Sequence, residues 1–168
     1  MTEQERLEQV AEECMYQLSY LRIPVGNVRG FTVNRRAISR WGQCKQRPEG
    51  YYINISSILC DGKHDDGLRS TIFHELIHTC PGCMNHGEKW KHWAAIVTEH
   101  TGLIIQRADS CEDKGVDRDL IRSKRNYKYE FKCNGCGAIV KRERASRFTK
   151  NYEHYVCAKC KGKFTRIK

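Results

Sequence analysis

The sequence predicts an α+β protein built from two parts, and three features of the 168-residue chain lead to that expectation. Apolar side chains recur at helical spacing in three stretches of the first two thirds. Between the first two of these stretches, apolar and polar residues alternate as they do in half-buried strands. The last third contains two Cys-x-x-Cys pairs, which are typical of a small β module organised by its cysteines.

The first element expected is an amphipathic helix over residues 3–21, ended by Pro24 and Gly26. Its apolar stripe consists of Leu7, Val10, Ala11, Cys14, Leu18 and Leu21. Because these positions are three or four apart, they fall on one helical face. This face is expected to lie against the core.

Short strands are expected next, over Val28–Val33, Ile38–Trp41 and Tyr51–Ile58. The turn residues Pro48 and Gly50 separate the last two stretches. The last two strands are therefore predicted to form a hairpin in a small sheet.

Two further helices are expected over 68–79 and 87–101. Asp65 and Asp66 precede the first and are candidate N-cap residues. Gly102 follows the second, where a helix commonly ends in a left-handed residue.

Length and hydropathy exclude several classes of protein. A chain of 168 residues is too short for a TIM barrel or a two-lobed kinase. The mean hydropathy is −0.70 and no apolar run approaches about 18 residues, so no membrane span is expected. The polar, acidic first ten residues do not resemble a secretory signal. The high count of ten cysteines is therefore expected to reflect metal binding by some of them rather than a disulfide framework.

The net positive charge is confined to one end of the chain. Residues 1–110 hold 13 basic and 13 acidic side chains, whereas 111–168 hold 17 and 7, so the net +10 belongs to the last third. We therefore expect a neutral domain over 1–108, a charged linker over 109–126 and a basic module over 127–168. A basic module suggests a polyanionic partner.

The first chemical motif is His74-Glu75-Leu76-Ile77-His78 in the expected helix 68–79. Histidines four residues apart lie on one helical face and can bind one metal ion. Zinc held this way lowers the pKa of a bound water, and the neighbouring carboxylate can take its proton. A third ligand has to come from elsewhere, and His86 and Glu88 are the main candidates.

The pair Cys80-Pro81-Gly82-Cys83 lies between this motif and His86. It has no second pair nearby to complete a metal site, so a structural role in the loop is the default interpretation.

Three segments make the chain resemble the SprT-like zinc metalloproteases, the Spartan-related family. They are Arg40-Trp41-Gly42-x-Cys44, then the H-E-x-x-H motif, then His86-Gly87-Glu88-Lys89-Trp90. The resemblance covers roughly residues 5–105, and many family members also carry a cysteine-rich tail. The loop between the second and third histidines is short here, which departs from the family pattern.

This resemblance implies a zincin-like metalloprotease domain with an N-terminal helix, a small sheet and two active-site helices. It implies that His74, His78 and His86 bind catalytic zinc and that Glu75 is the general base. It also implies cleavage of proteins in a DNA-linked setting, including proteins crosslinked to DNA, and hence a role in DNA repair.

The second chemical motif is a C-x₂-C-x₂₀-C-x₂-C pattern, which is a strong signal for a zinc ribbon. The four thiolates would complete a tetrahedron and leave no open position, so this second zinc is predicted to be structural; the ligands are Cys133, Cys136, Cys157 and Cys160. Gly137 and Gly162 follow the two pairs, where positive φ is often needed.

Between the cysteine pairs, basic residues interleave with aromatic ones. The basic candidates for phosphate contacts are Lys141, Arg142, Arg144, Arg147 and Lys150. Most of the rings are expected to form the ribbon's own core, and nothing indicates sequence-specific reading of bases.

Two functions are the main ones open on this basis, and a third possibility, that the ribbon binds protein substrates rather than DNA, is less favoured by the basic charge of the tail. The first is a zinc endopeptidase acting on proteins associated with DNA, with Glu75 activating a zinc-bound water. The alternative is a non-catalytic zinc protein that binds nucleic acid. Glu75 favours the enzyme, because a structural zinc site has no need of an adjacent carboxylate. The expected location is the cytoplasm, or the nucleus and chromatin in a eukaryote.

Overall fold

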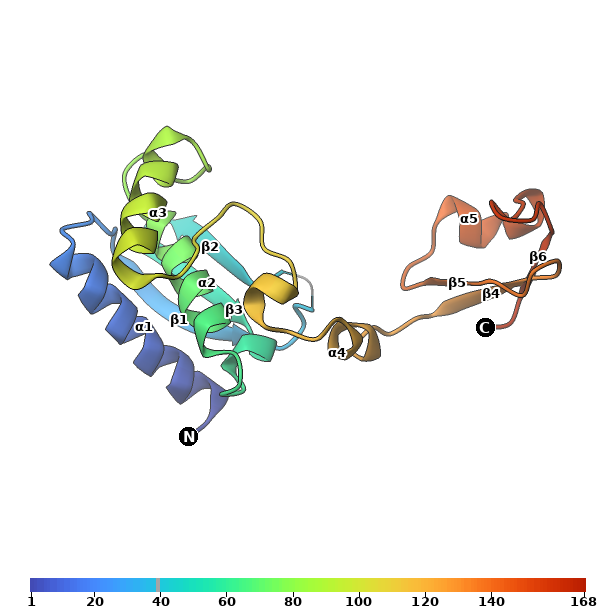
Figure 1. The fold of residues 1–168 in the computed structure, drawn as a ribbon, viewed down its shortest axis with the longest axis horizontal. Helices are drawn as coiled ribbons and strands as arrows, with labels where there is room; N and C mark the ends of the chain where they lie inside the picture. The colour runs from blue at the N-terminus through green and yellow to red at the C-terminus, as the bar shows by residue number, and fades with distance from the viewer. Residues whose placement is uncertain (39) are drawn as a thin grey trace. The chain divides into compact units, whose positions relative to one another are not determined.

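The computed structural model describes residues 1–38 and 40–168 (Figure 1), and its contacts divide the chain into two compact units. Unit 1 is Met1–Arg122 and unit 2 is Ser123–Lys168. Across the described residues, no helix combines the length and the apolar character that crossing a bilayer requires. The α+β fold class predicted from the sequence is confirmed.

Unit 1 begins with helix α1, Glu3–Tyr20. Thr2 and Glu5 form a capping box, in which each side chain accepts a hydrogen bond from the other's backbone N–H. The expected apolar stripe is buried, including Leu7 and Cys14, which are both 0% exposed. The helix therefore packs as its sequence pattern predicts.

The sheet of unit 1 has the strand order β1-β3-β2, with β1 at Val28–Asn34, β2 at Gly42–Arg47 and β3 at Gly50–Ser56. Strands β2 and β3 form the predicted antiparallel hairpin, whereas β1 pairs with β3 in parallel. The strand expected over 38–41 was wrong in position. It includes residue 39, which lies outside the described residues, and the hairpin strand begins only at Gly42.

Strand β3 also ends before the expected Ile58. The Ser56 hydroxyl accepts a hydrogen bond from the Ile58 N–H and starts a 3₁₀ turn over Ser57–Cys60. This local bond competes with continuation of the strand.

Helices α2, Asp65–Ile77, and α3, Glu88–Thr101, follow. Asp65 and Asp66 lie inside the first turn of α2 rather than at its N-cap, where His64 forms no side-chain cap. The two carboxylates still face the positive end of the helix dipole. Gly102 ends α3 with φ of 74°, as expected.

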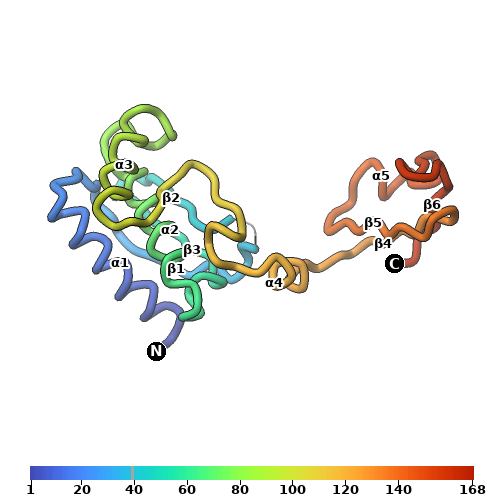
Figure 2. The backbone as a smooth tube through the Cα atoms, in the orientation of Figure 1, coloured from blue at the N-terminus to red at the C-terminus, as the bar shows by residue number. Residues whose placement is uncertain are grey.

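Helix α2 is the centre of unit 1, and Figure 2 shows its path among the other elements of that unit. It contacts α1, α3, β2 and β3. Nine of its thirteen residues are buried, which is why its sequence has little amphipathic pattern. The H-E-x-x-H motif therefore lies on the most enclosed helix.

The segment expected to be a linker is largely part of unit 1. It contains a 3₁₀ turn over Glu112–Lys114 and helix α4 over Arg118–Ser123. Lys114, Val116 and Ile121 are only 2%, 3% and 5% exposed. The sequence did not reveal this packing, because Val116 and Ile121 alone are too few to form a periodic apolar pattern.

Unit 2 is a small three-stranded sheet of order β5-β4-β6, paired antiparallel throughout. The strands are β4, Tyr129–Cys133, β5, Ile139–Arg142, and β6, Phe164–Arg166. Short helix α5, Arg147–Lys150, and a 3₁₀ turn, Tyr152–His154, lie between β5 and β6. Its buried hydrophobic cluster is limited to Phe131, Cys133, Cys157 and Phe164.

Candidate metal centres

Three histidines of unit 1 converge on one point. His74 and His78 lie one turn apart at the end of α2, and His86 precedes α3. The Nε2 atom of His74 is 3.2 Å from that of His78 and 3.1 Å from that of His86. All three ligand atoms lie within 4.8 Å of one another. The structure thus brings together the three ligands that the sequence analysis named.

Two backbone carbonyls orient the first two imidazoles. His74 Nδ1 is 2.9 Å from the carbonyl oxygen of Gln106, and His78 Nδ1 is 2.7 Å from that of Cys83. A carbonyl oxygen only accepts, so each Nδ1 carries the proton and each Nε2 presents a lone pair. Two lone pairs at 3.2 Å repel unless a cation lies between them. The donor set therefore fits a metal ion such as zinc.

The surroundings keep these imidazoles neutral. Burial and the neighbouring His78 and His86 lower the pKa of His74 to about 3. The Trp90 ring packs against all three, with centroid distances of 4.8, 5.7 and 4.6 Å to His74, His78 and His86. Neutral, immobilised imidazoles are the form that binds a metal ion.

Glu75 lines the same cleft as His74 and is only 6% exposed. Burial raises the pKa of its carboxyl to about 7, while a hydrogen bond from the Cys44 backbone and the charge of Arg40 act in the opposite direction. A bound dication would favour the ionised form further. The Glu75 carboxyl can therefore both accept a proton from water and release it again.

Strand β2 passes very close to this carboxylate. A Cβ atom on Gly42 would lie 2.5 Å from Glu75 Oε1 and 2.8 Å from Thr71 Cγ2. Only a glycine allows such an approach. Gly42 belongs to the Arg40-Trp41-Gly42 segment that the sequence analysis singled out, and this contact explains the glycine.

A cleft of about 260 Å³ opens over the site. Its lining includes His74 and Glu75 from α2, and Arg40 and Trp41 from the approach to β2. Arg107, Ala108 and Asp109 also line the cleft. The cleft therefore gives access to Glu75 and to His74, one of the three converging histidines.

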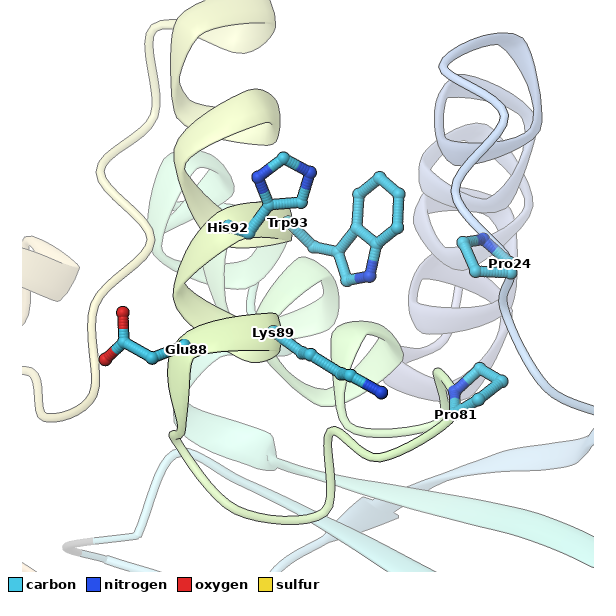
Figure 3. Close-up of a pocket in the computed structure, with 6 residues that line it drawn as sticks. All are labelled: Pro24, Pro81, Glu88, Lys89, His92 and Trp93. Atoms are coloured by element: carbon cyan, nitrogen blue, oxygen red, sulfur yellow. The ribbon is translucent and has the colours of Figure 1, made fainter.

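Glu88, the other candidate for the third ligand, is not part of the histidine group. Glu88 has a side chain 90% exposed that pairs with Lys91. Glu88 and His92 line a separate apolar pocket of about 450 Å³ together with Pro24, Pro81, Lys89 and Trp93 (Figure 3). None of the three converging histidines lines that pocket.

Sequence reasoning missed the backbone groups of the site. Cys80 and Cys83 are buried free thiols, but the site uses the Cys83 carbonyl, which orients His78. The Gln106 carbonyl does the same for His74. Because every residue type has a backbone carbonyl, the side-chain sequence could not predict that these two carbonyls orient the histidines.

The four cysteines of unit 2 also converge. The Sγ atoms of Cys133 and Cys160 are 3.4 Å apart, and those of Cys136 and Cys157 are 3.7 Å apart. All four lie within 4.8 Å of one another. Backbone hydrogen bonds, led by that from Cys136, lower the pKa of the Cys133 thiol and favour the thiolate that binds a metal.

The two Cys-x-x-Cys turns of unit 2, called knuckles below, use glycine differently from what the sequence suggested. Gly137 has φ of 72° as expected, but in the second knuckle Lys161, with φ of 60°, takes the left-handed conformation. Gly162 instead permits close approach, because a Cβ there would lie 3.0 Å from Cys133 Sγ and 2.9 Å from the Gly135 nitrogen. The expectation of positive φ at Gly162 was wrong.

The basic candidates of unit 2 are all exposed; they are Lys141, Arg142, Arg144, Arg147 and Lys150. Lys141 lies 5.6 Å from the Tyr127 ring centroid and Arg142 lies 5.5 Å from that of Phe148. The rings of Phe148 and Tyr152 each pack against Phe131. The five exposed basic side chains are therefore accessible to phosphates, whereas most of the aromatic rings pack in the core of unit 2.

Comparison with known proteins agrees with this geometry. The model of the SprT-like family matches residues 4–109. The germ cell nuclear acidic protein of Drosophila melanogaster is 33% identical over 108 residues, which are 60% of this chain. The aligned stretch spans only 9% of that relative's length. Since the family model matches more than half of the chain, this protein belongs to the SprT-like family.

Proposed function

We propose that the chain is a zinc-dependent endopeptidase of the HExxH type that acts on proteins associated with DNA. The observation that carries the proposal is the buried carboxylate of Glu75, which lines an open cleft together with His74, one of three convergent histidines. A structural metal site has no use for such a carboxylate, whereas hydrolysis requires a base.

In this proposal, His74, His78 and His86 hold the catalytic zinc, with the first two oriented by the carbonyls of Gln106 and Cys83. Zinc in this site supplies a Lewis acid that acidifies water and stabilises developing negative charge. Glu75 accepts the proton of the attacking water and passes it to the leaving amine. Burial raises the pKa of Glu75 and a bound dication would lower it, so the two effects act in opposite directions on this carboxyl.

The proposal that the chain acts on DNA-associated proteins depends on the basic residues of unit 2. Its exposed Lys141, Arg142, Arg144, Arg147 and Lys150 can neutralise phosphates, and the last third of the chain carries the whole net charge. The four cysteines would hold a second, structural zinc that folds this small module. Proteins crosslinked to DNA are the proposed substrates, which places the chain in DNA repair, in the cytoplasm or in a nucleus.

The test compares the zinc-loaded protein with two variants, Glu75→Gln and Glu88→Gln. Each is incubated with a basic DNA-binding protein, with and without single-stranded DNA, and the fragments are separated on a gel. We expect cleavage by the wild type and by Glu88→Gln, stimulated by DNA, and none by Glu75→Gln at equal zinc content. Glu88 is the matched control because it is a nearby carboxylate exposed to solvent.

The alternative function is a non-catalytic zinc protein that binds nucleic acid. The exposed basic residues of unit 2 support it as well as they support the protease. Tight DNA binding by all three proteins with no cleavage in any lane would favour this alternative and count against the protease.

A further inference from the structure

A segment beyond the two active-site helices forms part of the metal site. We call residues 106–114 the strap. The strap begins with the Gln106 carbonyl that accepts the hydrogen bond of His74 Nδ1. Its next residues, Arg107, Ala108 and Asp109, line the cleft over Glu75. The strap therefore sets both the orientation of one metal ligand and one wall of the cleft.

The far end of the strap is fastened by a buried lysine. Lys114 is 2% exposed, and its Nζ lies 2.8 Å from Asp109 Oδ2 and 2.8 Å from Ser70 Oγ. Ser70 lies on α2 one turn before His74, so Lys114 ties the strap to the helix that carries the metal ligands. The Trp41 indole N–H also donates to the Asp109 carbonyl at 3.3 Å.

The backbone around Lys114 is held equally closely. A Cβ on Gly67 of α2 would lie 2.6 Å from the Lys114 carbonyl oxygen. The glycine thus lets the strap lie directly on the helix. Burying the Lys114 ammonium costs free energy unless its partners stay in place. The ion pair with Asp109 therefore favours a single position of the strap on α2.

We propose that Lys114 is a positioning residue for the metal site: it fixes the strap so that the Gln106 carbonyl holds the His74 imidazole in its metal-binding tautomer. Lys114 lies outside the stretch matched by the family model, which ends at residue 109. The inference rests on the proposed function only in taking zinc as the ion bound by the three histidines.

The test measures zinc affinity, which does not depend on proteolysis. Zinc is withdrawn from the full chain with a graded series of chelators, and loss from each site is followed. Partners that orient a metal-bound histidine are typically worth 10–100-fold in affinity. We expect Lys114→Met to weaken the histidine site by that factor while the four-cysteine site, an internal reference, is unchanged. Lys63→Met, at an exposed lysine of the same unit, should leave both sites unchanged.

Two further measurements separate positioning from general destabilisation. The variant Lys114→Met/Asp109→Leu leaves no buried charge unpaired, so it should restore the thermal midpoint of unit 1 but not the zinc affinity. In the zinc-free protein, nitrogen-15 NMR of the histidine rings should show His74 losing its fixed Nδ1–H tautomer in Lys114→Met. Unchanged zinc affinity in Lys114→Met, or full recovery of affinity in the double variant, would overturn the proposal. Absence of protease activity in the wild type would leave these zinc measurements intact.

Discussion

Gly42 is the residue whose substitution tests the geometry around Glu75 most cleanly. Gly42→Ala would place a methyl group 2.5 Å from Glu75 Oε1, and the buried carboxylate has little room to move. We expect cleavage to fall about 100-fold, because small displacements of catalytic groups cost that much. Zinc content should be unchanged. The measurement is peptide cleavage at matched zinc loading.

Gly30→Ala is the matched control for that variant, since nothing lies within 4 Å of the added Cβ and Gly30 belongs to the same sheet. If the two variants cleave at equal rates, the close contact at Gly42 has no catalytic consequence.

Lys161 offers a second test at the scale of one residue. It is an exposed lysine with φ of 60°, a conformation that costs a side-chain-bearing residue about 1 kcal/mol relative to glycine. Because metal binding and folding of the ribbon are coupled, Lys161→Gly should tighten zinc binding by about fivefold. Gly137→Ala should weaken it, since its φ is 72° and its Cβ meets open space. Equal chelator resistance of all three proteins would refute this account of the knuckles.

Individual side chains of the site were predictable where chemistry fixes residue type and spacing. His74 and His78 are four apart because a helix then places both on one face, and the cysteine pairs follow from knuckle geometry. His86 was named through family resemblance rather than spacing. Lys114 could not be found this way, because a lysine in a charged segment is ordinarily solvated, and only the fold shows it buried.

At the scale of elements, helices were predicted more closely than the sheet. Helix α1 has one buried face, so its 3.6-residue period is visible in the sequence. The parallel pairing of β1 with β3 is a long-range contact that no local pattern encodes. The hairpin of β2 and β3 was visible from its turn, although β2 begins later than expected.

The packing of the segment after residue 108 leads to a prediction about where unit 1 ends. A chain of residues 1–122 should unfold at the same temperature as unit 1 of the full protein. A chain of residues 1–108 loses the buried Val116 and Ile121 and should be less stable by roughly 3–5 kcal/mol. Thermal denaturation followed by circular dichroism measures the difference. Coincident unfolding of the two shortened chains would show that residues 109–122 behave as a linker.

For the molecule as a whole, the sequence already separated a neutral first part from a basic, cysteine-rich end. The structure keeps that division but moves the boundary to Arg122, because burial rather than charge decides where a unit ends. Each unit contains its own candidate metal group, three histidines in unit 1 and four cysteines in unit 2. The two metals are thus expected to bind independently and to serve different purposes.

The most direct test of the proposed protease measures bound zinc and peptide cleavage together in three full-length proteins. The wild type should hold two zinc ions per chain and cleave. His86→Ala should hold one and have no activity, whereas Cys160→Ala should hold one and still cleave a peptide in the absence of DNA. Cleavage by His86→Ala at the wild-type rate, or retention of both zinc ions in that variant, would contradict the assignment of the three histidines as the catalytic metal site.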